Sequence, residues 1–361
     1  MSNLPASPLR VVITNAGECS YIEGWEDYRC AVSTDRRSWT RIAATEYADG
    51  ELRMTLDRDE LGGADAAWLA YFAPHSYEQN MALVAHAGAS ARARVRTVGT
   101  TLDGADMEVV TVRAAGASPE ADAGKRSVWF IARQHPGESM ASWWMEGFLA
   151  RLLDDADPLA ARLLDKATFH VVPNMNPDGS RRGHLRTNAA GANLNREWAT
   201  PTEDYSPEVF HVLREMHAAG LDLLLDVHGD EALPYNFIAG SEGVPGWTPR
   251  LAGLQKAFCD AFERANPDFQ QVEVRARARA CCAASAQALC VYESTRVCVC
   301  HSPTLPRALT LAPTALRTHA FLHMHSRARA RAHRATLWMP PGRQTCSCAA
   351  TPSPRRSTRP R

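Results

Sequence analysis

The sequence contains no long apolar run: no segment reaches the roughly 18 consecutive apolar residues that a membrane-spanning helix needs. The first residues, Met1 to Arg10, also lack the apolar core of a secretory signal peptide. Neither sign of charge is in excess, because 40 basic residues balance 40 acidic ones. The overall charge therefore indicates no nucleic-acid partner and no membrane partner, and we expect a cytoplasmic protein.

Cysteine is scarce over the first three quarters of the chain, where only Cys19, Cys30 and Cys259 occur. Three scattered thiols do not make a disulfide framework, and they are typical of a protein from a reducing compartment. The remaining cysteines are crowded between Cys281 and Cys348. This uneven distribution indicates that the end of the chain differs in kind from the rest.

The last quarter is basic and repetitive. Glu293 is the only acidic residue after Val274, and two-residue repeats such as Arg327-Ala-Arg-Ala-Arg-Ala332 dominate. Runs of CG dinucleotides encode alternating Arg-Ala, and runs of GT encode Val-Cys. We interpret residues 273–361 as a low-complexity basic tail that is either disordered or translated from intron or out-of-frame sequence. Basic runs attract phosphate, but this tail lacks lysine and regular aromatic residues, so we do not expect it to bind nucleic acid.

Short strand-like runs fill the first part of the chain, separated by Gly, Asp and Asn. They predict a small antiparallel, β-sandwich-like domain over residues 1–114, followed by a linker rich in Ala and Gly. The expected strands are Arg10–Thr14, Tyr28–Val32, Leu52–Leu56, Ala66–Phe72 and Met107–Val112.

Residues 126–272 follow a different rhythm, in which apolar strand-like runs alternate with helical stretches. This alternation predicts an α/β domain with a mixed, mainly parallel sheet flanked by helices. The expected strands are Ser127–Ala132, Ala167–Val172 and Leu221–Val227, and the expected helices are Met140–Leu153 and Pro207–Ala219. Ligands bind such sheets beyond the carboxyl ends of the strands.

Metal-ligand side chains follow two of these strands. His135-Pro-Gly-Glu138 comes directly after the first strand, and His228 comes directly after the third. Two imidazoles and one carboxylate are a common ligand set for hydrolytic zinc, and they leave a fourth position for water. Taken alone, His135 and Glu138 would be an ordinary surface pair and His228 a buried histidine. Their shared position at strand ends instead favours one metal site.

Between these ligands lie Asn174-Met-Asn-Pro-Asp-Gly179, Arg186-Thr-Asn188 and Gly191-Ala-Asn-Leu-Asn-Arg196. This order of motifs, with the strand-end histidine after them, resembles the zinc metallocarboxypeptidases. The position of Arg186, ten residues ahead of Arg196, and Tyr71-Phe-Ala-Pro74 in a preceding β domain are similar to the cytosolic carboxypeptidase-like branch. The resemblance extends from about Leu9 to Gly246.

The resemblance implies a hydrolase that removes C-terminal residues from peptides or protein tails, with one zinc ion held by His135, Glu138 and His228. Arg196 and Asn195 would then bind the free carboxylate of the substrate, for which a guanidinium fork is well suited. Arg186 would stabilise the oxyanion.

Three smaller expectations concern the surroundings of the site. Asn193 stands where many relatives carry an Asp that orients the first zinc histidine, and its amide oxygen can accept the same hydrogen bond without the charge. We expect Asn176-Pro-Asp-Gly179 to form a tight turn. We expect Trp143 and Trp144 to pack a helix rather than to stack on a ligand.

The general base of the reaction is not identified. Relatives use a glutamate on a late strand, and Thr336-Leu-Trp-Met-Pro340 is similar to the segment that carries it, with Trp338 in its place. Glu293 is the only carboxylate nearby in the tail and is an unconvincing substitute. We therefore expect impaired turnover. The alternatives are a zinc-binding pseudoenzyme and a zinc acylase or deacylase of the same superfamily, although the Asn195-Arg196 pair favours the peptidase.

Overall fold

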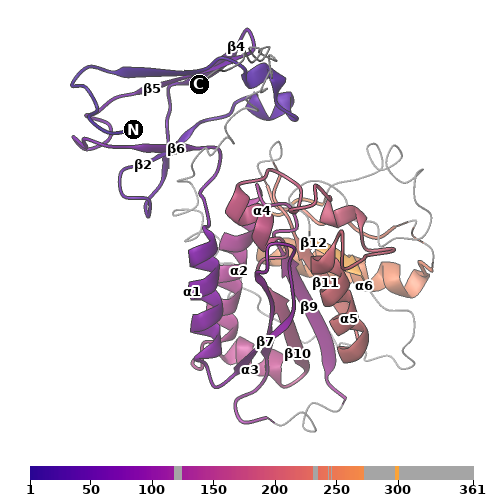
Figure 1. Cartoon of the computed structure of the whole chain (residues 1–361). Helices are drawn as coiled ribbons and strands as arrows, with labels where there is room; N and C mark the ends of the chain where they lie inside the picture. The colour runs from indigo at the N-terminus through magenta and orange to yellow at the C-terminus, as the bar shows by residue number, and fades with distance from the viewer. Residues whose placement is uncertain (118–123, 231–234, 243, 245, 272–296, 301–361) are drawn as a thin grey trace, which may run out of the picture.

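The computed structural model describes residues 1–117, 124–230, 235–242, 244, 246–271 and 297–300. An N-terminal β unit lies at one end of a larger α/β unit (Figure 1). Most of the tail, including Glu293 and Trp338, is outside the described residues. The expectations for those two residues, and for the disorder or origin of the tail, are therefore not addressed by the structure.

The N-terminal unit contains two three-stranded antiparallel sheets. Their orders are β1 (Leu9–Ile13), β5 (Glu51–Leu56), β4 (Thr45–Ala48) and β3 (Thr40–Arg41), β2 (Ala31–Ser33), β6 (Trp68–Ala70). In β5 the apolar side chains alternate with polar ones, so Leu52, Met54 and Leu56 all face the interior. They share one apolar core with Val32 of β2, which holds the two sheets together.

The α/β unit is built on one six-stranded sheet. Its order is β12 (Val297–Cys300), β11 (Leu223–Val227), β9 (Arg126–Ala132), β10 (Ala167–Val172), β8 (Asp106–Val112), β7 (Ala93–Thr100). The three central strands, β11, β9 and β10, are parallel, and the outer strands pair antiparallel. The expected α/β fold with a mixed sheet is confirmed, with the parallel pairing confined to the centre.

One expected strand belongs to a different unit from the one we assigned. Met107–Val112, assigned to the N-terminal domain of residues 1–114, is the core of β8 and pairs with β10. Its side chains are buried on both faces, with Val110 in one core of the large sheet and Val109 in the other. A strand covered on both faces fits the middle of a large sheet. The change from one unit to the other therefore comes before helix α1 (Tyr77–Gly88), which the sequence analysis missed.

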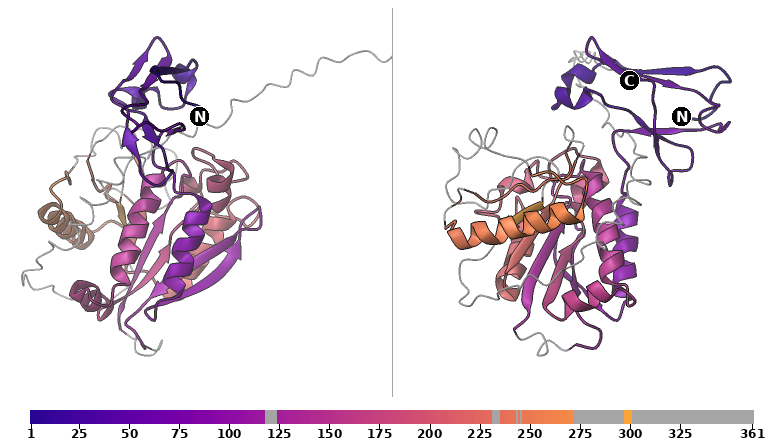
Figure 2. Two further views of the ribbon diagram at one scale, coloured as in Figure 1. Left: turned by 90° about the vertical axis from the view of Figure 1, so that its left-hand side faces the viewer. Right: turned by 180° about the vertical axis from the view of Figure 1, so that it is seen from behind.

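Helices cover both faces of the large sheet. Helices α1, α2 (Ser139–Leu152) and α3 (Pro158–Leu164) pack on one face, and α5 (Pro207–Ala219) packs on the other (Figure 1). Helix α6 (Pro249–Ala265) is seen best from behind (Figure 2). Strand β9 explains the two layers, because Phe130 faces the α2 side while Trp129 faces the α5 side. Among the described residues, no helix combines the length and apolar character needed to span a bilayer.

Candidate metal centre and substrate site

The three candidate metal ligands lie together at the carboxyl ends of neighbouring strands. Strands β9 and β11 are parallel, with Ala132 opposite Val227, so the residues that follow them leave the sheet side by side. One ligand atom from each of His135, Glu138 and His228 lies within 4.8 Å of the other two. All three side chains are buried, so water competes little for these atoms.

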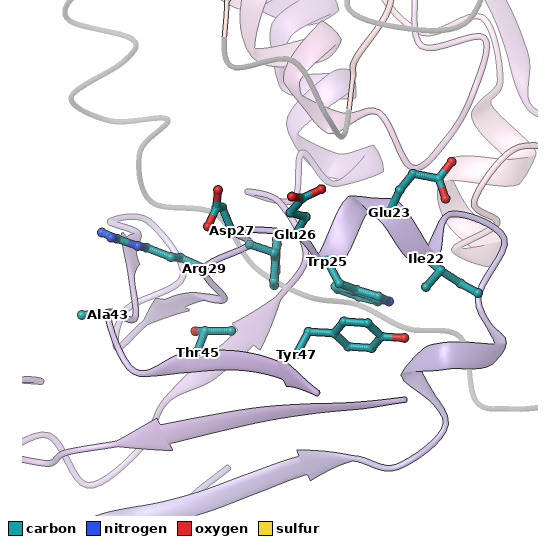
Figure 3. Close-up of a pocket in the computed structure, with 10 residues that line it drawn as sticks. Ile22, Glu23, Trp25, Glu26, Asp27, Arg29, Ala43, Thr45 and Tyr47 are labelled. Atoms are coloured by element: carbon teal, nitrogen blue, oxygen red, sulfur yellow. The ribbon is translucent and has the colours of Figure 1, made fainter. Parts of the chain in front are cut away.

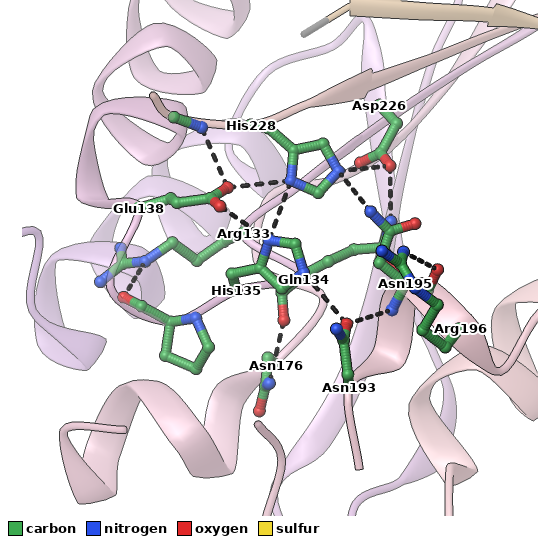
Figure 4. A network of polar contacts seen from close by, with 12 residues as sticks. Arg133, Gln134, His135, Glu138, Asn176, Asn193, Asn195, Arg196, Asp226 and His228 are labelled. Atoms are coloured by element: carbon green, nitrogen blue, oxygen red, sulfur yellow. Dashed lines mark hydrogen bonds and ion pairs between the residues drawn. The ribbon is translucent and has the colours of Figure 1, made fainter. Parts of the chain in front are cut away.

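Both histidines turn the same ring nitrogen towards this cluster (Figure 4). The Nδ1 atoms of His135 and His228 are 3.2 Å apart, and they lie 2.7 and 2.9 Å from the two carboxylate oxygens of Glu138. On the outer side, Nε2 of His135 is 3.1 Å from Oδ1 of Asn193, and Nε2 of His228 is 2.7 Å from Oδ2 of Asp226. These oxygens only accept hydrogen bonds, so a proton on each Nε2 would satisfy them and leave each Nδ1 as the nitrogen that can bind a metal. The donor set fits a zinc ion.

The electrostatics of the cluster also favour a cation. Burial by itself raises the pKa of Glu138, but the two imidazoles outweigh it and hold that pKa well below its ordinary value. For His228 burial lowers the pKa, while the carboxylates of Asp226 and Glu138 outweigh burial and raise it. The carboxylate of Glu138 thus stays ionised, and positive charge beside it is stabilised.

Two residues that the sequence analysis did not assign to the site extend this network. Gln134 donates from Nε2 to Oδ2 of Asp226 at 2.5 Å, and its Oε1 accepts from the indole of Trp198 at 2.9 Å. Asp226 could have been found, because it precedes His228 by two residues on β11 and so lies on the same face of that strand. Gln134 gives no such signal in the sequence.

A glycine allows the close approach of the two ligand segments. The backbone N–H of Gly229 donates to Oε2 of Glu138 at 2.9 Å. A Cβ atom at this position would lie 2.0 Å from the sulfur of Met140 on α2. Glycine therefore lets the chain after β11 pass against the start of α2.

Residues 183–198 bring the candidate substrate residues to the metal cluster. Leu185 accepts a hydrogen bond from Gly137 at 2.8 Å, so the half-buried Arg186 follows a residue bound to the ligand turn. Asn195 is buried with Nδ2 3.4 Å from Nε2 of His228. Arg196 is exposed, and its Nη1 donates to the carbonyl of Asn195 at 3.0 Å.

The expected tight turn at Asn176–Gly179 is wrong. Helix α4 (Pro177–Arg182) begins there, with the Asn176 side chain accepting from the N–H of Gly179 at 3.0 Å. An Asn followed by Pro is a common helix start, because Asn caps the first turn and Pro needs no donor. The Nδ2 of Asn176 also donates to the carbonyl of Gln134 at 3.0 Å, which ties this helix to the ligand turn.

The expected packing role of the two tryptophans is confirmed. Trp144 stacks on Phe148 and Phe130 inside the core between α2 and the sheet. Trp143 points the other way, and its indole donates to the carbonyl of Ala73 at 3.1 Å. The first joins α2 to the sheet and the second joins α2 to the segment that leaves the N-terminal unit.

A cavity of about 700 Å³ lies in the N-terminal unit, away from this cluster (Figure 3). Trp25, Tyr47, Glu23 and Glu26 are among the residues that line it. None of the candidate metal or substrate residues lines it. The candidate site at the strand ends of the large sheet is therefore separate from this cavity.

Comparison with known proteins matches both units. Residues 78–237 match the zinc carboxypeptidase family, and residues 1–72 match the cytosolic carboxypeptidase N-terminal domain. An uncharacterized protein from Zymomonas mobilis is 46% identical over 263 residues, which are 73% of this chain and 66% of that protein. Mouse cytosolic carboxypeptidase 2 is 30% identical over 49% of this chain and only 21% of its own length. The chain thus spans just under two thirds of the first relative and about a fifth of the second.

A solved structure of a metallo-carboxypeptidase from Pseudomonas aeruginosa, in complex with (2-guanidinoethylmercapto)succinic acid, is 40% identical. The match has a TM-score of 0.68 and covers 74% of this chain and 68% of that one. The matches of both units and the cluster of metal-ligand side chains at the strand ends indicate the same family. The chain belongs to the zinc carboxypeptidase family, and it joins the domain of that family to the N-terminal domain of the cytosolic carboxypeptidases.

Proposed function

We propose that this chain binds one zinc ion through His135, Glu138 and His228 and acts on the free C-terminus of a peptide or protein. The observation that carries the proposal is the convergence of two Nδ1 atoms and a buried carboxylate at neighbouring strand ends. A zinc ion at this position would polarise the scissile carbonyl and activate water for hydrolysis.

The residues of this chain supply the binding part of the reaction. Arg196 presents a guanidinium at the surface beside the cluster, where it can pair with a substrate carboxylate. Asn195 supports this role, since its buried Oδ1 has no hydrogen-bond partner among the described residues. A half-turn of the amide would bring Oδ1 to the N–H of His228 and turn Nδ2 outward as a donor. Arg186, next to the ligand turn, would stabilise the oxyanion.

The reaction adds water across the terminal peptide bond, with hydroxyl going to the carbonyl carbon and a proton to the leaving amine. That proton transfer needs a general base and acid. The described carboxylates of the network have other partners, because Glu138 faces both histidines and Asp226 is shared by His228 and Gln134. We therefore propose turnover about 10² to 10⁴ slower than in an enzyme with the glutamate.

The test is release of the last residue from an N-blocked dipeptide, measured beside the same dipeptide with an amidated C-terminus. We expect slow, zinc-dependent cleavage of the free acid only. Arg196→Met should raise KM by at least tenfold, whereas Arg181→Met, an exposed arginine on α4, should leave KM unchanged. Equal cleavage of the amide would contradict the carboxypeptidase function.

The second candidate is a zinc-binding pseudoenzyme, favoured by Trp338 standing where the similar segment of relatives has a glutamate. Turnover of the dipeptide separates this candidate from the carboxypeptidase, and binding of (2-guanidinoethylmercapto)succinic acid, the ligand of the Pseudomonas relative, separates it from an acylase. A pseudoenzyme binds it through Arg196 and cleaves nothing, while an acylase would not need Arg196 for its substrate.

We also propose that the protein works in the cytoplasm. Its three described cysteines, Cys19, Cys30 and Cys259, are all free thiols, as in proteins from a reducing compartment. Fractionation of the source cells with an antibody against the chain checks this, and recovery outside the cytoplasm would contradict it.

A further inference from the structure

Arg133 has an unusual position at the end of β9. It lies directly after the last residue of that strand, and its backbone has φ +64°, a left-handed conformation that non-glycine residues seldom adopt. Its side chain is buried, with the residue only 5% exposed. Burial lowers its pKa to about 10, which still leaves the guanidinium charged at neutral pH. A buried charge in a strained backbone needs strong compensating contacts.

Those contacts join three separate segments. Nε of Arg133 donates to the carbonyl of Pro136 at 2.7 Å, inside the ligand turn between His135 and Glu138. Nη1 donates to the hydroxyl of Ser142 on α2 at 2.8 Å and to the carbonyl of His75 at 3.3 Å. The guanidinium thus links the ligand turn, the first turns of α2 and the segment between the two units.

The segment that receives Arg133 is itself fixed against α2. Trp143 donates from its indole to the carbonyl of Ala73, and its ring packs edge-on against that of His75 at a centroid distance of 5.1 Å. Trp143 also packs against a small apolar cluster that contains Trp39 of the N-terminal unit. Helix α2 begins at the residue after Glu138, so a shift of the first turn of this helix moves a metal ligand.

We infer that Arg133 is a positioning residue for the metal site, and that it makes metal affinity depend on the junction between the N-terminal unit and α2. The inference rests on the proposed function, because it assumes the zinc site. Groups that orient metal ligands typically change metal affinity by about 10- to 100-fold when they are lost. Arg133 is expected to act in this range, through the turn it holds rather than through contact with the ion.

The test measures zinc affinity of the full chain by competition with a chromogenic chelator. Arg133→Met should weaken zinc binding at least tenfold, and Arg133→Lys, which keeps the charge without the fork, should weaken it by an intermediate factor. The matched control is Arg92→Met, since Arg92 is also buried and donates to backbone carbonyls, those of Leu152 and Asp154, at the end of α2 that is remote from Glu138. This control should lower the melting temperature and leave zinc affinity within twofold.

Trp143→Phe provides a second variant that does not touch the ligand turn. It removes the indole hydrogen bond to Ala73 and reduces the ring that packs against His75, and a two- to fivefold loss of zinc affinity is expected. If neither Arg133 variant folds, the zinc affinity of Trp143→Phe decides, and an affinity equal to that of the wild type would overturn the inference. Wild-type affinity in a folded Arg133→Met protein would also overturn it while leaving the zinc site standing. A wild-type chain without zinc affinity would overturn the proposed function and this inference together.

Discussion

At the residue scale, the site depends on which atom of each side chain faces the cluster. Nδ1 of both histidines faces inward because an oxygen acceptor stands at each Nε2. For His228 the acceptor is a carboxylate oxygen of Asp226, whereas for His135 it is the amide oxygen of Asn193. The two imidazoles are therefore unequal, and that of His135 is the weaker electron donor to a metal.

Asn193→Asp should raise zinc affinity severalfold, because a carboxylate accepts the hydrogen bond from Nε2 of His135 more strongly. Asn193→Ala should lower it by about tenfold. Competition with a chelator measures the zinc affinities of both variants and of the wild type and so checks their order. Equal affinities in all three proteins would show that the contact at 3.1 Å does not tune the site.

Side chains at strand ends were the part of the site most open to prediction from sequence. His135, Glu138 and His228 come together because β9 and β11 are parallel neighbours. The alternation of strands and helices in the sequence predicted this parallel pairing. Gln134 and Arg133 were not predicted, since their roles depend on contacts with residues far away in the chain, such as Asp226 and His75.

At the scale of elements, α5 is fastened to the segment that carries the substrate residues. Near its start, Glu208 accepts from Nδ2 of Asn188 at 3.1 Å, and both residues are fully buried. Asn188 in turn accepts from the backbone N–H groups of Ala190 and Ala192. Burial, the main cause, raises the pKa of Glu208 to about 7.

This pKa makes stability depend on pH. Because the pKa of Glu208 is higher in the folded protein, the folded protein binds this proton more tightly than the unfolded chain does. The ionised carboxylate destabilises the fold, and this effect is absent below the unfolded pKa of about 4.5. Stability is lost as the pH rises towards 7, by up to about 3 kcal/mol. Glu208→Gln should therefore match the wild type at pH 4 and exceed it at pH 8.

Urea unfolding of both proteins between pH 4 and pH 8, with chelator present, measures this difference. Wild type and variant share every other titrating group, so the difference between their unfolding free energies isolates Glu208. A difference that stays constant with pH would contradict the raised pKa.

Regular elements were predicted where apolar periodicity was strong, as in β9, β10 and α5. Helix α1 was missed although it starts with a capping box formed by Ser76 and Gln79, because its apolar face is short. Strand β8 was found but assigned to the wrong unit, because a run of strands cannot show from sequence alone which sheet each strand joins.

At the scale of the whole molecule, two matched domains are joined through a buried contact region rather than by a free linker. The N-terminal unit reaches α2 through Ala73, His75 and Trp143, and α2 starts beside a candidate metal ligand. The sequence showed two units, but this coupling follows only from their packing.

The central claim is that one zinc ion binds at His135, Glu138 and His228. The most direct test is the metal content of the full chain after dialysis against zinc-containing and then zinc-free buffer. We predict one zinc per wild-type chain and less than about a tenth of that in His228→Ala, where one of three ligands is lost. His170→Gln, a change at a buried histidine on β10 stacked against Trp129, should keep the full equivalent. A folded wild-type chain without zinc, or full zinc in His228→Ala, would contradict the account.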